Sequence, residues 1–268
     1  MKLIANARMY STTVATKAAW TRLFEWAHGR SGVPLAMLAH EPPKLLATLW
    51  ERNDLGAVMM CGLPLSRRAA PPLIVAQPVP SLPRYGGRAV YCTDIVVAAN
   101  APYRTLADTF GARVGYTLKD SQSGYYALRH HLLTHHADVA EPYAAITGGL
   151  MNARGVIAAI AAGRIDVGPL DGYVHDLIIH TEPEFAAQVR ILVSTEQTPM
   201  PAIVASDEAL TPDALARLRD AFSAAITAPE LAAERATLLL AGFAQPGASA
   251  FEALKARADI VDAGPPWP

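Results

Sequence analysis

The stretch that decides the fold is residues 88–100, RAVYCTDIVVAAN, an extended apolar run interrupted by Asp94. Before it, short apolar runs alternate with helical patterns in a β-α-β-α-β order, which is typical of a parallel sheet covered by helices. After it, the same alternation begins again and continues to residues 189–206, VRILVSTEQTPMPAIVAS, where a proline-containing segment leads into another apolar strand. These stretches contain two extended crossings, near residues 90–96 and 195–201, which predict that the chain leaves one α/β unit, forms a second, and returns to the first.

We therefore expect an α/β protein of two lobes joined by two hinge crossings. Lobe 1 is expected to be discontinuous, with residues 1–93 and 200–268, and lobe 2 to comprise residues 94–199. Each lobe should hold a mixed, mostly parallel sheet flanked by helices. A single large doubly wound sheet is the alternative, and the matched crossings favour two lobes. Because crevices at strand ends and domain interfaces bind ligands, we expect the binding site in the cleft between the lobes.

Helices are expected where apolar residues recur with helical periodicity. Residues 13–29, for example, place Ala19, Leu23, Trp26 and Ala27 on one face. The other helices are expected at residues 42–52, 102–111, 123–136, 152–164, 171–181, 211–227, 229–242 and 248–259.

The composition argues against several classes of function. The chain has 268 residues, of which 51% are hydrophobic and 18% charged, and its formal net charge is -1. Without a concentrated positive surface, we expect no nucleic-acid partner. No apolar run approaches the roughly 20 residues that span a bilayer, so we expect no membrane insertion. Residues 1–13 contain no apolar leader segment, which predicts a cytoplasmic protein if the sequence is complete and a periplasmic one if a leader was removed.

Cysteine, histidine and catalytic motifs give no sign of a metal or of catalysis. Cys61 and Cys92 are expected to be free, buried thiols, because two distant cysteines do not make a disulfide framework. His131 and His135 have the i, i+4 spacing of a chelating pair, but no further ligand is indicated and a solvated helix end is favoured. The sequence has no nucleophile elbow, P-loop or dinucleotide-binding glycine fingerprint. We expect no catalytic residue, no cofactor and no metal.

Residues 120–126, DSQSGYY, lie between an expected strand and an expected helix. The first turn of a helix leaves backbone N–H groups unpaired and carries a partial positive charge. Glycine permits close approach and serine hydroxyls add donors, which makes Ser121, Ser123, Gly124 and Tyr125 candidates for binding an oxyanion. The simpler interpretation is that Ser123 is only the N-cap of the helix, and the local residues alone favour it.

Other candidates in lobe 2 also have a functional and a structural interpretation. Asp171 begins a helix, either as its N-cap or as a partner for a ligand ammonium group, and Tyr173 could pack on the ligand. Asp94 interrupts an apolar run, so it needs a partner or water and either faces the cleft or stabilises the hinge. Tyr91 lies on the opposite face if the strand is regular. The glycine pair ending at Gly149 precedes a helix, where turn chemistry is the alternative.

In lobe 1, Met9 and Tyr10 follow the first expected strand, and such a loop of a parallel sheet opens onto the crevice. Cys61 ends the third expected strand of the same lobe. Glu196 and Thr198 are expected as hinge or rim residues of the return crossing. The complete expected ligand-binding set is Met9, Tyr10, Cys61, Tyr91, Asp94, Ser121, Ser123, Gly124, Tyr125, Gly149, Asp171 and Tyr173.

Four segments follow the order of a known family. Residues 107–132, ADTFGARVGYTLKDSQSGYYALRHHL, resemble the second-lobe entry of substrate-binding proteins of phosphate, phosphite and phosphonate ABC transporters. Residues 146–178 resemble a later segment of the same family, in which a glycine pair, a helix and a strand ending at an aspartate follow one another. Residues 93–100 and 189–206 resemble its two crossings. The resemblance covers residues 88–206.

This resemblance implies a periplasmic-binding-protein fold of type 2, whose two lobes close on a small ligand. It implies a solute-binding protein that captures an anionic or zwitterionic, phosphonate-like ligand for uptake through an ABC permease, and it favours the periplasm. We expect a monomer. The family's turn is often Ser-Thr-Ser-Gly, whereas residues 121–124 are Ser-Gln-Ser-Gly, so an amide replaces one hydroxyl. A leaderless cytosolic enzyme on the same scaffold is the alternative, and a sensory module ranks third.

Overall fold

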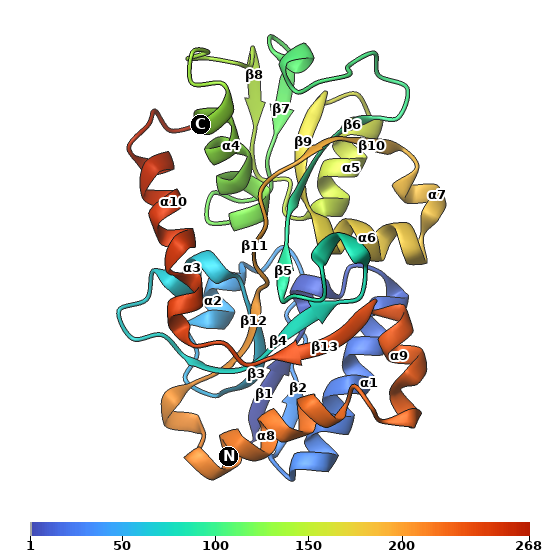
Figure 1. Ribbon diagram of the computed structural model, residues 1–268, viewed down its shortest axis with the longest axis vertical. Helices are drawn as coiled ribbons and strands as arrows, with labels where there is room; N and C mark the ends of the chain where they lie inside the picture. Colours follow the sequence, from blue (N-terminus) through green and yellow to red (C-terminus); the bar gives the residue numbers. More distant parts are fainter. Residues whose placement is uncertain (1) are drawn as a thin grey trace. The chain divides into compact units, whose positions relative to one another are not determined.

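The computed structural model describes residues 2–268 and divides them into two compact units (Figure 1). Unit 1 comprises the described residues up to Val90 together with Pro199–Phe251, and unit 2 comprises Tyr91–Thr198 together with Glu252–Pro268. The chain therefore forms two α/β units and crosses between them, as the sequence predicts. The C-terminal segment from Glu252 onward differs from the expected lobe boundaries, because it belongs to unit 2.

Unit 1 is built on a mixed, six-stranded sheet. Its strands in spatial order are β13 (Leu240–Ala244), β4 (Leu73–Pro80), β12 (Ala202–Ala205), β3 (Leu55–Met60), β1 (Leu3–Asn6) and β2 (Leu35–Met37). β1 pairs in parallel with β2 and β3, whereas β12 is antiparallel to both β3 and β4. Every residue of β3 is buried, as its uninterrupted apolar sequence predicts.

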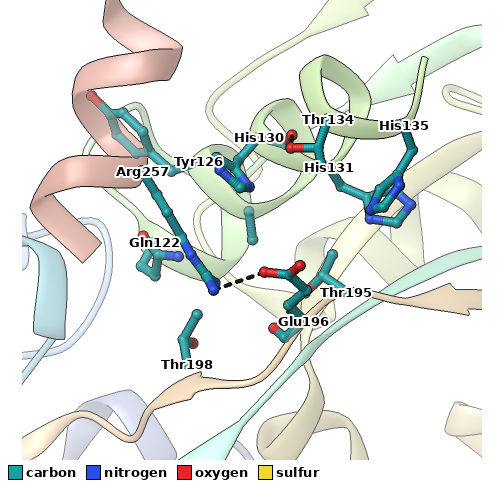
Figure 2. Close-up of a pocket in the computed structure, with 11 residues that line it drawn as sticks. Gln122, Tyr126, His130, His131, Thr134, His135, Thr195, Glu196, Thr198 and Arg257 are labelled. Carbon is teal, nitrogen blue, oxygen red and sulfur yellow. Dashed lines mark hydrogen bonds and ion pairs between the residues drawn. The ribbon is translucent and has the colours of Figure 1, made fainter. Parts of the chain in front are cut away.

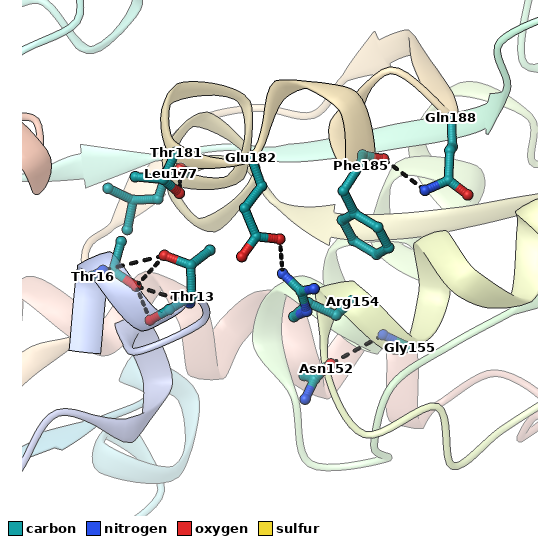
Figure 3. A network of polar contacts seen from close by, with 10 residues as sticks. All are labelled: Thr13, Thr16, Asn152, Arg154, Gly155, Leu177, Thr181, Glu182, Phe185 and Gln188. Atoms are coloured by element: carbon teal, nitrogen blue, oxygen red, sulfur yellow. Dashed lines mark hydrogen bonds and ion pairs between the residues drawn. The ribbon is translucent and has the colours of Figure 1, made fainter. Parts of the chain in front are cut away.

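The longest helix of unit 1, α1 (Val14–Ser31), begins with a capping box. The Thr13 hydroxyl accepts from the Thr16 amide at 3.2 Å, and the Thr16 hydroxyl accepts from the Thr13 amide at 2.9 Å (Figure 3). Phe24 packs edge-to-face on Phe222 with ring centroids 5.6 Å apart, which joins α1 to α8 (Pro212–Ala224). The remaining helical segments are η1 (Arg8–Tyr10), α2 (Leu46–Trp50), α3 (Gly62–Ser66), η2 (Pro83–Tyr85), η5 (Asp207–Ala209), η6 (Pro229–Leu231), α9 (Ala232–Thr237) and η7 (Ala248–Phe251).

Unit 2 is built on a mixed, five-stranded sheet. Its strands in spatial order are β10 (Val189–Ser194), β6 (Thr93–Ala98), β9 (Val167–Asp171), β7 (Arg113–Gly115) and β8 (Ala145–Thr147). β7 is parallel to both β8 and β9, whereas β6 is antiparallel to β9 and β10. The boundaries between the two units fall within two short strands, β5 (Val90–Tyr91) and β11 (Thr198–Pro199).

The helices of unit 2 enclose an apolar core. They are η3 (Ala107–Thr109), the π-helix η4 (Gln122–Tyr126), α4 (Ala127–His135), α5 (Ala153–Ala161), α6 (Gly172–Thr181), α7 (Pro183–Ala186) and α10 (Glu252–Asp262). The buried residues of this core are Ile95, Val97, Leu106, Val114, Leu128, Leu132, Tyr143 and Val167. Asp262 ties α10 to this unit, because the Tyr126 hydroxyl donates to its carboxylate at 3.0 Å.

Three of the expected helices differ in the structure. The helix expected at 102–111 is only the 3-10 turn η3, because the Asp108 carboxylate accepts from the amides of Arg104 and Thr105 and holds the chain in a turn. The helix expected at 42–52 begins only at Leu46, after a proline pair that lacks amide hydrogens.

The end of the helix expected at 229–242 is instead the strand β13. Leu240 and the residues after it pair antiparallel with β4, because the edge of that strand offers backbone partners to an apolar segment. Cys61 and Cys92 are both buried, and neither forms a disulfide within residues 2–268, as expected. No helix within residues 2–268 has both the length and the apolar character needed to cross a membrane.

Candidate functional site

The strands β7, β8 and β9 of unit 2 run in parallel, so their carboxyl ends meet at one edge of the sheet. Each of them leads into a helix, and each helix has a side-chain N-cap. The caps are Ser121, whose Oγ accepts from the Gly124 amide, Asn152, whose Oδ1 accepts from Gly155, and Asp171, whose Oδ1 accepts from Val174, all at 3.0 Å. Three helix N-termini thus bring partial positive charge to one sheet edge. We call this edge the strand-end site.

The serine turn at this edge corrects the expected capping residue. Ser121, and not Ser123, caps the helix, so its hydroxyl is already engaged. The Ser123 hydroxyl has no hydrogen-bond partner within residues 2–268, and Ser123 is only partly buried. Its carbonyl accepts from the Thr93 hydroxyl at 3.3 Å, which fixes the turn to β6. Ser123 therefore carries the available hydroxyl of this turn.

The helix that follows the serine turn begins as a π-helix, η4. Such turns inside helices are rare and occur frequently at functional sites. Gly124 is required here because a Cβ atom would lie 1.8 Å from the Thr117 Oγ1 atom and 2.9 Å from the Ser121 Oγ atom. The Thr117 amide in turn donates to the Gly124 carbonyl at 3.1 Å. Gly124 thus serves close packing of the turn against the end of β7.

The loop after β8 is fastened to the same strand end. The amides of Leu150 and Met151 donate to the carbonyls of Tyr116 and Thr117 at 3.2 and 3.4 Å. Gly149 has a φ of 75°, a left-handed conformation that favours glycine. The expected glycine turn before α5 is therefore present, and it is exposed.

A salt bridge stabilises the start of α5. The Arg154 guanidinium lies 2.5 Å from the Glu182 carboxylate, and it stacks over the Phe185 ring with a separation of 4.3 Å (Figure 3). Glu182 lies between α6 and α7, so this contact holds the first turn of α5 against the end of α6. The N-terminus of α5 is thereby fixed in unit 2.

Asp171 combines its capping role with an altered acidity. Burial raises the pKa of the Asp171 carboxyl to about 7, although part of the residue reaches solvent. Hydrogen bonds from the amides of Val174 and Tyr173 oppose this rise, and the negative charges of Asp94 and Asp176 add to it. The carboxyl therefore changes charge near neutral pH, close to the helix N-terminus of α6.

The raised pKa of Asp171 predicts a pH-dependent stability. Between pH 4 and 7 the unfolded chain loses this proton while the folded chain keeps it, so stability should fall with rising pH across this window and level off above it. The upper bound is about 4 kcal/mol, because one pKa unit is worth about 1.4 kcal/mol. Thermal unfolding of the wild type and of Asp171→Asn should show the excess slope only in the wild type. Since asparagine also caps helices, identical pH profiles would contradict the assignment.

Asp94 is the acceptor of a fully buried polar network and not an exposed binding group. Its exposed fraction is 0%. Its carboxylate accepts from His175 Nδ1 at 2.9 Å and from the Ser194 hydroxyl at 2.7 Å, and the Cys92 thiol lies 3.8 Å away. These contacts link α6 and β10 to β6. A charged group within an apolar run needs hydrogen-bond partners, and this network supplies them. The contacts therefore favour the structural interpretation of Asp94.

The aromatic candidates of unit 2 are buried. The Tyr125 hydroxyl accepts from Arg129 Nη1 at 2.9 Å and from the Trp267 amide at 3.4 Å, so it is engaged by the C-terminal segment. Tyr91 and Tyr173 are almost completely buried. Burial raises the pKa of Tyr173 well above its ordinary value, which keeps its hydroxyl neutral. A ligand role for these three residues stays a prediction.

The candidates of unit 1 lie at the carboxyl ends of its first and third strands, as expected. Met9 and Tyr10 form the 3-10 turn η1 after β1, and Cys61 is the N-terminal flanking residue of α3 after β3. Tyr10 is fully buried, with its hydroxyl 4.0 Å from the Met200 sulfur, whereas Met9 is only partly buried. Their ligand-binding role stays a prediction.

A small cavity of about 20 Å³ lies along η4 and α4 (Figure 2). Gln122, the amide that departs from the family's turn, lines it, is only 3% exposed, and has no hydrogen-bond partner for its Oε1 atom within residues 2–268. Arg257 and Glu196 close the cavity with an ion pair of 2.7 Å. A cavity of this size holds about one water molecule. The Gln122 side chain therefore lines this cavity, and we assign it no role in binding an oxyanion.

The histidines of α4 line the same cavity. His131 and His135 have ring centroids 4.5 Å apart. Burial, together with the neighbouring histidines, lowers the pKa of His131 to about 4, so this ring is neutral at physiological pH. Within residues 2–268, no group of three or more His, Cys, Asp and Glu side chains is arranged to hold a metal ion.

Sequence reasoning misses three residues that shape the strand-end site. Thr117 packs against Gly124, the Thr93 hydroxyl donates to the Ser123 carbonyl of the serine turn, and His175 donates to the Asp94 carboxylate. The only local sign of a role for Thr117 in the sequence is its position at the end of an expected strand. The contacts of Thr93 and His175 join residues far apart in the chain, and no spacing motif reveals them.

Comparison with known proteins relates most of the chain to one family. The family model described as the periplasmic substrate-binding protein of phosphonate ABC transporters matches residues 14–252. A binding protein component of an ABC phosphonate transporter from Pseudomonas aeruginosa is similar in structure, with a TM-score of 0.80, 15% identity, and coverage of 98% of this chain and 87% of that chain.

Two further solved structures have the same fold. PhnD1 from Prochlorococcus marinus, in complex with methylphosphonate, has a TM-score of 0.77 and 13% identity, and the match covers 98% of both chains. The Xanthomonas citri protein XAC2383, bound to ATP, has a TM-score of 0.66 and 20% identity, again over 98% of both chains. No curated protein sequence matches this chain. The structural similarities confirm the two-lobe periplasmic-binding-protein fold that the sequence predicts.

Proposed function

Because the chain belongs to the family of periplasmic substrate-binding proteins of phosphonate ABC transporters, we propose that it captures a small phosphonate-like anion for delivery to an ABC permease. The proteins of this family are periplasmic, and we place this chain there with them. It binds its ligand without transforming it. The solved relative with methylphosphonate makes that compound the first ligand to test.

The observation that carries the proposal is the strand-end site of unit 2. Three capped helix N-termini meet at one sheet edge, and helix N-termini favour oxyanions through their N–H groups and their dipoles. Ser123 adds a hydroxyl that has no hydrogen-bond partner within the described residues 2–268. A phosphonate has three acceptor oxygens, so it can use several of these donors together.

Asp171 limits which ligands fit this site. A fully ionised carboxylate would repel a phosphonate, but with a pKa of about 7 the carboxyl is protonated in a large fraction of molecules at neutral pH. In the ionised form it could pair with the ammonium of an aminophosphonate. The site is therefore compatible with anionic and zwitterionic phosphonates, and both classes belong in the ligand panel.

Titration calorimetry of the purified protein tests the proposal. We expect saturable binding of methylphosphonate or 2-aminoethylphosphonate, and weaker binding of sulfate. The proposed function would be overturned if phosphonates, phosphate, sulfonates and amino acids all gave no heat of binding.

The variant Ser123→Ala tests whether the strand-end site is the phosphonate site. We expect affinity to fall about tenfold, because a hydrogen bond to a charged group contributes about 1.5 kcal/mol. Ser249→Ala is the matched control, since Ser249 is exposed in unit 1. If both variants bind methylphosphonate with equal affinity, Ser123 does not contact the ligand. That result would not contradict the proposal that the protein binds a phosphonate.

A further inference from the structure

Unit 2 contains a second, larger cavity of about 500 Å³ that the proposed function does not use. It lies between the C-terminal half of α4, residues 136–146 and the chain end at residues 265–268. Figure 1 shows this chain end beside α4. Pockets for small molecules commonly measure about 300–1,000 Å³, so the cavity is large enough for a ring-bearing ligand.

The walls of this cavity are mainly apolar and aromatic. Trp267 is the centre of the aromatic group, with its ring 6.0 Å from the Tyr143 ring and 6.0 Å from the Tyr125 ring, both nearly perpendicular to it. Leu132 and Ile146 contribute aliphatic surface. Flat rings and branched aliphatic groups favour an apolar ligand body with a planar face.

Arg129 places a buried positive charge at this cavity. Its exposed fraction is 5%, and its guanidinium stacks over the rings of Tyr125 and Trp267 at 5.2 and 5.7 Å. It donates to the Tyr125 hydroxyl at 2.9 Å and to the Pro265 carbonyl at 2.5 Å. Within residues 2–268 no carboxylate forms an ion pair with it. Buried charges are normally paired, so this guanidinium lacks the counter-charge that its environment calls for.

The other ionisable side chains of the cavity restrict the ligand's charge. Glu141 and His136 also line it, and the Glu141 carboxylate disfavours a dianion. A guanidinium fork binds a planar carboxylate through two parallel hydrogen bonds, whereas a phosphonate dianion would also meet the repulsion of Glu141. A monoanion therefore fits this cavity better than the ligand class of the strand-end site.

We propose that this cavity is a second binding site, which takes a small aromatic carboxylate with its carboxylate on Arg129 and its ring against Trp267 and Tyr143. The site does not depend on the proposed phosphonate function. It is lined by Arg129, which contacts residues 265–268, and Tyr125 of the serine turn is not part of its lining.

Benzoate is the probe, added to the full-length protein. We expect saturable binding with a dissociation constant below about 1 mM, measured by calorimetry and by tryptophan fluorescence. The chain has four tryptophans, so the variant Trp267→Phe identifies the reporter and should remove the fluorescence change. Arg129→Met should weaken benzoate binding at least about tenfold. Arg30→Met, an exposed arginine of unit 1, is the matched control and should bind benzoate as the wild type does.

Two comparisons on the wild type decide the matter even if Arg129→Met does not fold. Benzyl alcohol, which keeps the ring and lacks the charge, should bind at least about tenfold more weakly than benzoate. Saturating benzoate should leave methylphosphonate affinity unchanged. Absence of saturable benzoate binding, equal binding of benzyl alcohol, or displacement of benzoate by methylphosphonate would each overturn the second site. A protein that binds benzoate but no phosphonate would contradict only the proposed function.

Discussion

The variant Gly124→Ala should lose at least about 100-fold in methylphosphonate affinity and about 2–4 kcal/mol in stability. The added Cβ atom would lie 1.8 Å from the Thr117 Oγ1 atom, 2.8 Å from the Thr117 Cβ atom and 2.9 Å from the Ser121 Oγ atom. Thr117 is buried and β-branched, so it has little freedom to move away. The π-helix η4 must therefore shift, and its first-turn N–H groups and the Ser123 hydroxyl shift with it.

The measurements are urea unfolding, followed by circular dichroism, and calorimetry with methylphosphonate. Gly29→Ala is the matched control, because a Cβ atom at Gly29 meets nothing within 4 Å and the residue lies inside α1. This control should be neutral, or stabilised by up to about 1 kcal/mol through helix propensity. If Gly124→Ala binds methylphosphonate as tightly as Gly29→Ala, the serine turn does not hold the ligand.

The second large effect is expected from Asp94→Ala, which should lower the free energy of unfolding by about 3–5 kcal/mol. The substitution leaves His175 Nδ1 and the Ser194 hydroxyl without their shared acceptor in a fully buried position. An unsatisfied buried donor carries its full desolvation cost, and a cavity adds to it. Urea unfolding gives the difference from the wild type.

Asp259→Ala in α10 provides the comparison for Asp94→Ala within the same unit. Asp259 forms an exposed i, i+4 ion pair of 3.0 Å with Lys255, and such pairs contribute about 0.5 kcal/mol or less. A loss of similar size in both variants would mean that the Asp94 network contributes no more than a surface pair.

The sequence predicts the fold well because its signals are local. The capping residue Asp171 precedes its helix as expected, and the apolar run of β3 marks a strand buried on both faces. The two crossings near residues 90–96 and 195–201 are the signal from which a discontinuous first lobe is expected. The helix expected at 102–111 fails because one side chain, that of Asp108, captures two amides that a helix would use.

The site is predicted less completely, because its decisive contacts join distant residues. Position and residue type point to the serine turn, but they cannot show that Ser121 is the cap and that Ser123 is left available. Asp94 and His175 are 81 residues apart, and no spacing motif announces their hydrogen bond. Arg129 likewise lies within a histidine-rich helix that looks solvated, and the distant chain end at Trp267 buries it.

The division of the chain also determines the order in which the protein can be completed during synthesis. Unit 1 requires residues up to Phe251, and unit 2 requires Glu252–Pro268, whose Asp262 and Pro265 bind Tyr126 and Arg129. Unit 2 therefore begins to emerge from the ribosome before unit 1 has all of its strands, but it is finished last. The nascent chain must hold an incomplete second unit until its final helix has been translated.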